Sequence, residues 1–300
     1  MWRQMRRSWQ LYLLLALPLA WLVTFQYYPM YGAQIAFRDF LPGDNMFKAE
    51  WVGLEHFERF FQSPMFSRLM VNTLGLSLYS LAVGFPIPVV FALSLNQVRT
   101  GLFKQSVQMV SYAPYFISTV VLVGMLLQFL DLRHGPANLL LSALGLKTIH
   151  FMGDANMFQS IYVWSGVWQY TGFNTVIYLA ALSTIDPALH EAALVDGANR
   201  LQRIWYIDLP GILPTAITLL ILNMGQIINV GFEKVFLMQN PLNTAISEVI
   251  STYVYKVGLI GGITNYSYAV AIGLFNSVIG LILLVAANQI MKRLTGSSLW

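Results

Sequence analysis

The chain contains no cysteine and little charge. With zero cysteines among 300 residues, disulfides, thiol catalysis and Cys-ligated metal are excluded. Charged residues make up only 10% of the sequence, whereas hydrophobic residues make up 57%. These proportions lie outside those of soluble domains and predict an integral membrane protein. The net charge of +4 comes from scattered residues rather than from a Lys/Arg-rich block, so no nucleic-acid partner is expected.

Charge is also missing from six long stretches of the chain. Each is longer than the roughly 20 residues that a helix needs to cross about 30 Å of hydrocarbon. We therefore predict an all-α polytopic membrane protein that forms a single domain over residues 1–300. The predicted helix cores are 11–31, 70–95, 106–129, 157–183, 212–232 and 266–291. Between the first two, WVGLEHFERFFQS predicts a short amphipathic helix rather than a soluble domain.

Lysine and arginine are distributed unevenly around these helices. If the N-terminus is cytoplasmic, nine of the 17 basic residues lie in short inner segments beside the helix ends. The others lie in longer outer loops that also carry most of the acidic residues. The positive-inside rule favours this orientation, in which both termini and the segment 186–210 face the cytoplasm.

Catalytic motifs are incomplete throughout the chain. His-Glu at 190–191 opens like the zinc motif H-E-x-x-H, but Leu194 stands where the second histidine is needed. Residues 145–148, Gly-Leu-Lys-Thr, lack the upstream glycine and the adjacent Gly-Lys pair of a phosphate-binding loop, so the chain alone is not expected to hydrolyse ATP. Asp-Gly at 196–197 resembles the start of a CDP-alcohol phosphotransferase motif without its later aspartates, which leaves a membrane lipid-headgroup transferase as one alternative. We expect no catalytic residue, metal site or cofactor on this chain.

One polar segment, from Asp186 to Pro210, separates the fourth and fifth predicted helices. Asp186 is an N-cap residue type and Pro187 suits the first helical position, so a short helix is expected to start here. Gly197 can adopt the left-handed conformation that ends a helix and turns the chain.

A second short helix is expected to follow the turn. Leu201, Ile204 and Trp205 form an apolar i, i+3, i+4 stripe, and residues 209–210 are then expected to reverse the chain into the membrane. The predicted helix-turn-helix exposes one carboxylate, Glu191, on a face of small residues. Two interpretations fit it: an amphipathic helix lying on lipid headgroups, or a docking surface for another protein.

The spacing within this segment favours docking. It reads E-A-A, three residues, Gly, nine residues, I-x-L-P, and resembles the cytoplasmic coupling loop of permease subunits of bacterial binding-protein-dependent ABC importers. The stretches 27–40, 111–125, 172–187 and 223–241 are similar to permeases of the LplB type, in the carbohydrate branch. The resemblance implies the type I ABC importer permease fold in the bacterial cytoplasmic (inner) membrane. It also implies that the ATPase-coupling residues are Glu191, Ala192, Ala193, Asp196, Gly197, Ile207, Leu209 and Pro210.

The same resemblance implies an importer built from several subunits in a lipid bilayer. These are a second permease subunit, expected to be a different chain, two cytoplasmic ATPase subunits that hold ATP and Mg, and an extracytoplasmic solute-binding protein. The implied substrate is an oligosaccharide or polysaccharide, with uronic-acid-containing glycans such as alginate as a special case. Arg133, His134 and Lys256 in outer loops could attract an acidic glycan, although basic residues near headgroups are common.

Neutral polar and aromatic residues inside the predicted helices are candidates for a substrate pathway. Because unpaired amides in hydrocarbon cost several kcal/mol, such residues must face a protein neighbour or a water-filled cavity. Helix–helix hydrogen bonding and an interfacial aromatic belt are the alternatives. In the fifth helix the spacing from Thr218 to Glu233 predicts one continuous polar face. The candidate pathway residues are Asn72, Trp168, Tyr170, Asn174, Asn223, Gln226, Asn229 and Asn276.

The mechanism that these features predict is alternating access driven by ATP hydrolysis on separate subunits. A stand-alone secondary transporter or channel is the principal alternative. It would need ion-coupling carboxylates deep within the helices, and only Glu233, at a helix boundary, approaches such a position.

Overall fold

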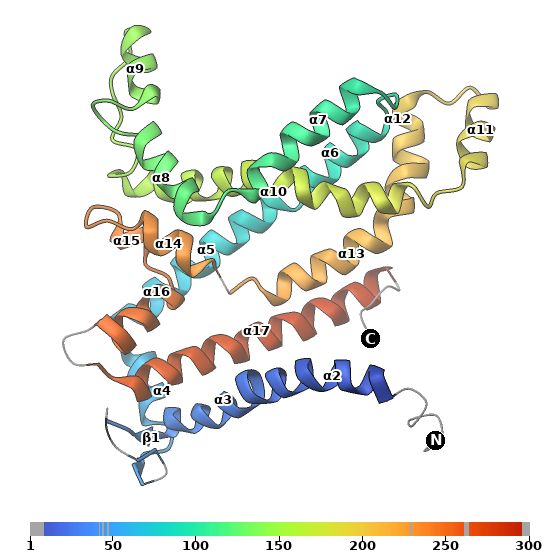
Figure 1. Cartoon of the computed structure of the whole chain (residues 1–300). Helices are drawn as coiled ribbons and strands as arrows, with labels where there is room; N and C mark the ends of the chain where they lie inside the picture. The colour runs from blue at the N-terminus through green and yellow to red at the C-terminus, as the bar shows by residue number, and fades with distance from the viewer. Residues whose placement is uncertain are drawn as a thin grey trace. The chain divides into compact units, whose positions relative to one another are not determined.

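The computed structural model describes residues 9–295 apart from 42, 44, 47, 229 and 261–263. The chain divides into two compact units, Met1–Ser63 with Val254–Phe275 and Pro64–Tyr253 with Asn276–Trp300 (Figure 1). We refer to them as unit 1 and unit 2. Helices α16 (Ile250–Tyr255) and α17 (Tyr266–Thr295) contribute residues to both units.

Unit 1 starts with a helical segment that changes type along its length. The order is α2 (Trp9–Leu22), a π turn (Val23–Tyr27), α3 (Tyr28–Met30) and a 3-10 turn (Tyr31–Phe37). The π turn directly precedes Tyr28-Pro29, and the Tyr28 N–H bonds to the Val23 carbonyl, five residues back. Proline has no N–H to donate to the carbonyl four residues before it, so a wider turn at this point accommodates Pro29 within a continuing helix.

The rest of unit 1 packs around aromatic side chains. A two-residue antiparallel ladder joins β1 (Arg38–Asp39) to β2 (Glu50–Trp51), a small departure from the all-α prediction. Helix α4 (Glu55–Gln62) is the predicted amphipathic helix, and its buried Phe60 ring lies 5.4 Å from the Phe275 ring of α17. A π turn, Lys256–Ile260, completes the unit.

Unit 2 contains most of the helices (Figure 1). In chain order they are α5 (Pro64–Gly84), α6 (Pro86–Asn96), α7 (Leu102–Tyr112), a 3-10 turn (Ala113–Phe116), α8 (Thr119–Phe129), α9 (Pro136–Ala143), α10 (Ala155–Leu182), α11 (Pro187–Val195), α12 (Arg200–Arg203), a π turn (Ile204–Asp208), α13 (Leu209–Gly225), α14 (Phe232–Met238) and α15 (Thr244–Ser247).

Helix α10 lies at the centre of unit 2 and contacts α5, α6, α7 and α13. One buried cluster joins its Phe158 and Val163 to Leu76 of α5 and Val235 of α14. A second joins its Tyr178 and Leu182 to Leu93 of α6 and Ile212 of α13. Gly172 allows α7 to approach closely, because a Cβ built there would lie 2.0 Å from the Ser111 carbonyl oxygen.

Membrane-spanning character is confirmed within the described residues. Four helical segments are long and apolar enough to cross a bilayer: Trp9–Phe37, Pro64–Asn96, Arg200–Gly225 and Tyr266–Arg293. A bent pair, Leu102–Phe116 with Thr119–Phe129, makes a fifth if it forms one span. Helix α10 occupies the fourth predicted position over 28 residues but is not apolar enough to qualify by composition. The number six therefore stays a prediction.

The third predicted helix, 106–129, is not continuous. Its two halves meet at an angle of 99°, with Ile117 and Ser118 extended between them. Pro114 interrupts the hydrogen-bond ladder on one side of the bend. On the other side, the Ser118 hydroxyl accepts a hydrogen bond from the Val121 N–H and starts a new helix.

The fifth predicted helix, 212–232, is also interrupted. Helix α13 ends at Gly225 and α14 begins at Phe232, and residues 226–228 and 230–231 between them are not helical. A single polar face running from Thr218 to Glu233 along one helix is therefore wrong. The chain between the fifth and sixth predicted helices, expected to be an outer loop, contains most of α14 together with α15 and α16.

Candidate functional site

The polar segment 186–210 begins with the predicted capped helix. The Asp186 carboxylate accepts a hydrogen bond from the Ala188 N–H at 2.9 Å, and Pro187 occupies the first turn of α11. Gly197 has φ +80°, and the Ala198 N–H bonds back to the Ala193 carbonyl at 2.9 Å, as in a Schellman-type helix end. The predicted start and end of this helix are both confirmed.

The second helix departs from the prediction. Asn199 and Gln202 form a reciprocal capping box at the start of α12. The chain then continues through the π turn 204–208 directly into α13, so the predicted reversal at residues 209–210 is wrong. Here again a π turn precedes X-Pro: the Leu209 N–H bonds to the Ile204 carbonyl, and Pro210 is absorbed without ending the helix.

The outer surface of this segment combines one carboxylate with apolar side chains. Glu191 and Ala192 are exposed, whereas Ala193, Ile207 and Leu209 are half-buried. Asp196, Gly197 and Pro210 are exposed as well. Large apolar side chains also reach the surface, at Leu189, Leu194, Val195, Leu201, Trp205 and Tyr206. Several exposed large apolar side chains in one short segment that also carries an exposed carboxylate are typical of a protein-docking site.

The inner side of the same segment is organised around Asp208, which has no exposed surface. One carboxylate oxygen lies 3.3 Å from Nε2 of His190 on α11. The other accepts a hydrogen bond from Nε2 of Gln97, the residue that caps the end of α6, at 2.9 Å. Sequence reasoning did not assign Asp208 to this role. The signal was an isolated acidic residue within the apolar I-x-L-P stretch.

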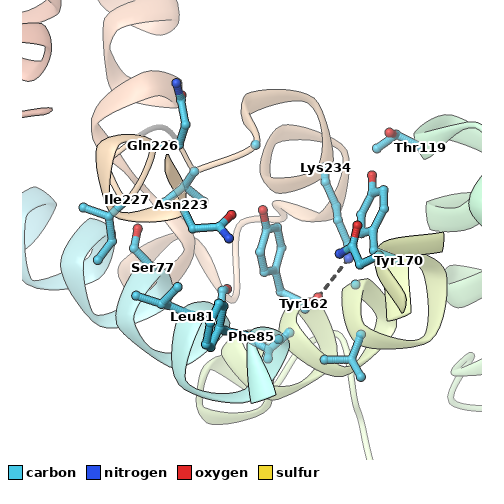
Figure 2. Close-up of a pocket in the computed structure, with 18 of the residues that line it drawn as sticks. Ser77, Leu81, Phe85, Thr119, Tyr162, Tyr170, Asn223, Gln226, Ile227 and Lys234 are labelled. Atoms are coloured by element: carbon cyan, nitrogen blue, oxygen red, sulfur yellow. Dashed lines mark hydrogen bonds between the residues drawn. The ribbon is translucent and has the colours of Figure 1, made fainter. Parts of the chain in front are cut away.

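A pocket of about 500 Å³, lined by both polar and apolar side chains, lies within unit 2 (Figure 2). It is lined by α5, α10, α13 and the start of α14, together with Thr119 of α8. Figure 2 shows Asn223 and Gln226 on one side and Tyr170 and Lys234 on the other. Aromatic rings that can pack on sugar faces and amides that can bind hydroxyl groups therefore line one space, whose volume suits a small ligand.

Lys234 gives this pocket a buried positive charge. Its side chain is only 7% exposed, and its ammonium donates a hydrogen bond to the Tyr162 carbonyl at 2.8 Å. The same ammonium lies 4.6 Å from the centre of the Tyr162 ring. Helix α14 is not among the segments that can span a bilayer, and burial lowers the pKa of Lys234 from 10.5 to about 8. The group is mostly protonated at neutral pH.

The chain matches a known family over most of its length. Residues 84–296 match the family described as binding-protein-dependent transport system inner membrane component. The chain belongs to this family. It is therefore a permease subunit of an ABC importer of the inner membrane, without an ATPase site of its own. This result decides against both the stand-alone transporter and the lipid-headgroup transferase.

Similar proteins and structures cover nearly the whole permease. It is 43% identical to Protein LplB of Bacillus subtilis (strain 168), over 96% of this chain and 90% of that protein. It is 41% identical to the polygalacturonan/rhamnogalacturonan transport system permease protein YteP of the same organism, over 94% and 88%. A chain in the crystal structure of a bacterial ABC transporter involved in the import of the acidic polysaccharide alginate superposes with a TM-score of 0.90, at 40% identity, covering 98% of this chain and 99% of that one.

A second solved structure holds the bacterial alginate ABC transporter in complex with an alginate pentasaccharide-bound periplasmic protein. Its matching chain has 39% identity and a TM-score of 0.90, covering 100% of the permease and 99% of that chain. These relatives establish the ABC importer permease fold.

The pocket of the permease brings together four of the eight candidate pathway residues: Tyr170, Asn174, Asn223 and Gln226. Asn72 is elsewhere and buried, and its amide donates to the carbonyls of Ala245 and Glu248. Trp168 lines a separate groove beside α6 and α7. Asn276 lies in α17, and Asn229 lies outside the described residues.

Most residues that line the pocket were not predicted from the sequence of the permease, among them Ser77, Tyr162 and Lys234. Lys234 was assigned to an outer loop, because the fifth helix was expected to run on to residue 232. The Gly225 and Gly231 positions on either side of the connection were the available signal that the helix ends early.

Proposed function

We propose that this permease moves a uronic-acid-containing oligosaccharide or polysaccharide through the pocket of unit 2, by alternating access. A solute-binding protein delivers the glycan from outside. Two cytoplasmic ATPase subunits with bound ATP and Mg drive the cycle, and a second, different permease subunit completes the pathway. Support for the acidic class comes from the names of similar proteins, which include a polygalacturonan/rhamnogalacturonan permease and an alginate importer.

The observation that carries this proposal is the buried ammonium of Lys234 beside aromatic and amide groups. A uronate carboxylate brings a charge that a protonated lysine can bind with a charge-assisted hydrogen bond. The Tyr162 and Tyr170 rings offer apolar surface for the sugar face. Glu233 lines the same pocket but is exposed in the first turn of α14, where the helix N-terminus stabilises a carboxylate.

The segment 186–210, which we call the coupling segment, supports the proposed docking on the ATPases. Glu191 and the small residue Ala192 are exposed beside large apolar side chains, a surface that suits docking into a cleft of another protein. Both termini and this segment then face the cytoplasm. Closure of the ATPases would move α11, and the continuous helix Arg200–Gly225 leads from this segment to Asn223 in the pocket.

The test is reconstitution of the full importer in liposomes with its binding protein. Oligogalacturonate and oligoalginate are supplied separately, with maltotetraose as a neutral control, and uptake and ATP hydrolysis are measured together. We expect at least one acidic glycan to stimulate both. Stimulation by maltotetraose with no response to either acidic glycan would contradict the proposal.

Variants of Lys234 test whether the pocket itself binds the charge. Lys234→Met keeps the length of the side chain without the ammonium, and loss of a charge-assisted hydrogen bond corresponds to about tenfold or more in acidic-glycan uptake. Lys234→Arg keeps the charge and should retain most of the uptake. Equal uptake by Lys234→Met and the unchanged permease, at equal recovery of the complex, would place the acidic group elsewhere.

A further inference from the structure

Asp208 is a carboxylate with no exposed surface, at a point where three segments of unit 2 meet. It ends the π turn between α12 and α13. Half-buried apolar residues surround the turn, and Ile185, Ile204 and Leu209 pack against the same buried cluster. A buried carboxylate is stable only when hydrogen-bond partners or opposite charges compensate its lost hydration.

The partners of Asp208 come from two different helices. Oδ1 lies 3.3 Å from Nε2 of His190 on α11, and Nδ2 of Asn96 approaches the same oxygen at 3.5 Å. Oδ2 accepts the hydrogen bond from Gln97 at 2.9 Å. Asn96 ends α6 and Gln97 caps it. One carboxylate thus bridges the coupling helix and the end of α6.

His190 is placed so that it can carry a force through α11. In this helix only His190 and Ala193 are half-buried, and every other residue is exposed. Glu191 is the next residue along the chain and is exposed. A push on the outer surface of α11 therefore reaches the rest of unit 2 through its inner side, where His190 makes the polar contact.

The end of α6 leads back to the pocket. Helices α5 and α6 form one helical segment, Pro64–Asn96, and Ser77, Leu81 and Phe85 of this segment line the pocket. Asp208 itself lies in the segment Arg200–Gly225, whose far end carries Asn223. The segments Pro64–Asn96 and Arg200–Gly225 each form part of the pocket wall, and the Asp208 carboxylate connects both of them to α11.

We propose that Asp208 is a positioning residue of the transport cycle, which joins the coupling helix α11 to α6 so that movement of the ATPases reaches the pocket. This inference rests on the proposed docking of the coupling segment on an ATPase. It does not depend on which glycan is carried, so the experiment can be done without substrate.

The experiment follows the pocket with a single cysteine, Gln226→Cys, in this naturally cysteine-free chain. In the reconstituted importer, labelling by a membrane-impermeant maleimide is compared without nucleotide and with ATP, Mg and vanadate. With Asp208 intact, we expect the labelling rate to differ several-fold between the two conditions. With Asp208→Asn added, we expect less than half of that difference, at unchanged basal ATP hydrolysis and complex recovery.

Further variants separate coupling from folding. His190→Ala and Gln97→Leu should each reduce the nucleotide-dependent difference in labelling rate. The double variant Asp208→Asn with His190→Ala should reduce that difference no further than Asp208→Asn alone. His190→Gln keeps a hydrogen-bond donor at this position and should therefore retain the difference. Asp131→Asn is the matched control, because Asp131 lies 3.6 Å from His134 in an exposed pair and should change nothing.

The outcomes are decisive in each case. A full nucleotide response in Asp208→Asn would overturn the inference and leave the proposed function intact. If Asp208→Asn is not recovered in the complex, a full response in both His190→Ala and Gln97→Leu would overturn it equally. No response with Asp208 intact would contradict ATPase docking itself, and both proposals with it.

Discussion

Glu191 is exposed while its neighbour His190 turns inward, so two adjacent residues of α11 make different contacts. We expect Glu191→Ala to leave the permease folded and inserted, since the carboxylate faces solvent. Loss of a charged hydrogen bond to the ATPase should weaken docking by about 1–3 kcal/mol, with lower uptake and lower glycan-stimulated ATP hydrolysis. Glu58→Ala on α4, also exposed, is the control. Normal uptake and complex recovery in Glu191→Ala would refute a docking role.

Gly197 is held in a left-handed conformation, with φ +80°, although a Cβ there would meet no atom within 4 Å. We expect Gly197→Val to impair coupling purely through backbone strain, of about 1–3 kcal/mol for a branched residue. Gly124→Val in α8 is the matched control. A Cβ at Gly124 would also meet no atom within 4 Å, but Gly124 does not have a left-handed φ. Complex recovery and ATP hydrolysis distinguish the two. Equal behaviour of both variants would argue against strain as the cause.

Lys234 gives the proposed transport a pH dependence with a defined sign. Burial lowers its pKa to about 8, so the ammonium is present at pH 7 and is lost as the pH rises through 8. Uptake of an acidic glycan should therefore fall between pH 7 and pH 9. In Lys234→Arg the guanidinium stays protonated, so the fall should be absent or much smaller. Identical pH profiles for the two proteins would show that Lys234 does not bind the acidic group.

At the scale of elements, the pocket depends on the ending of α13 at Gly225. Single cysteines at Asn223 and Gln226, which line the pocket, should react with impermeant thiol reagents. Leu222→Cys is the control, because Leu222 is exposed on the isolated chain but lies outside the pocket lining, where lipid or a partner would cover it. Equal reactivity at all three positions, or none at any, would contradict a water-filled pocket here.

The ends of some helices could be predicted from nearby residues, whereas the interruption of the fifth helix could not. The ends of α11 follow from Asp186, Pro187 and Gly197 alone, because caps act within a few residues. The interruption of the fifth helix does not follow, since membrane helices tolerate glycine and the apolar composition continues through residue 232. Its position depends on packing after the interruption, where Val230 joins the buried cluster of Leu76 on α5 and Val163 on α10.

The π turn before Pro210 shows why this proline was misread, and an equivalent turn precedes Pro29. Before Pro29 and before Pro210, the chain widens by one residue and continues as helix. In water, proline usually ends a helix, which predicted a reversal at residues 209–210. At Pro210 the wider turn keeps the neighbouring backbone groups paired, because the Leu209 N–H bonds to the Ile204 carbonyl, so the helix continues into α13. The candidate site was predictable where it rested on residue type, at Glu191 or Asn223. It was not predictable where it rested on the fold, at Asp208 or Lys234.

At the scale of the whole molecule, the bilayer takes the place of a core for much of the chain. The helical window within Trp9–Phe37 has no buried residues, and that within Tyr266–Arg293 is only 17% buried. Such apolar surface is stable in lipid or against another subunit and unstable in water. The stability of this permease is therefore a property of its membrane and its partners as much as of its own contacts.

The apolar surface of the coupling segment also bears on how the protein is made in a cell. Val195, Leu201, Trp205 and Tyr206 are between 65% and 89% exposed, in a part of the chain proposed to face the aqueous cytoplasm. A subunit synthesised ahead of its ATPase would present this surface to proteases and chaperones, which recognise exposed apolar segments. We expect pulse-labelled permease to be degraded several-fold faster in cells that lack the ATPase. Replacing Leu201 and Trp205 with serine should slow that degradation while preventing assembly, so the signal for docking is also the signal by which an unpaired subunit is removed.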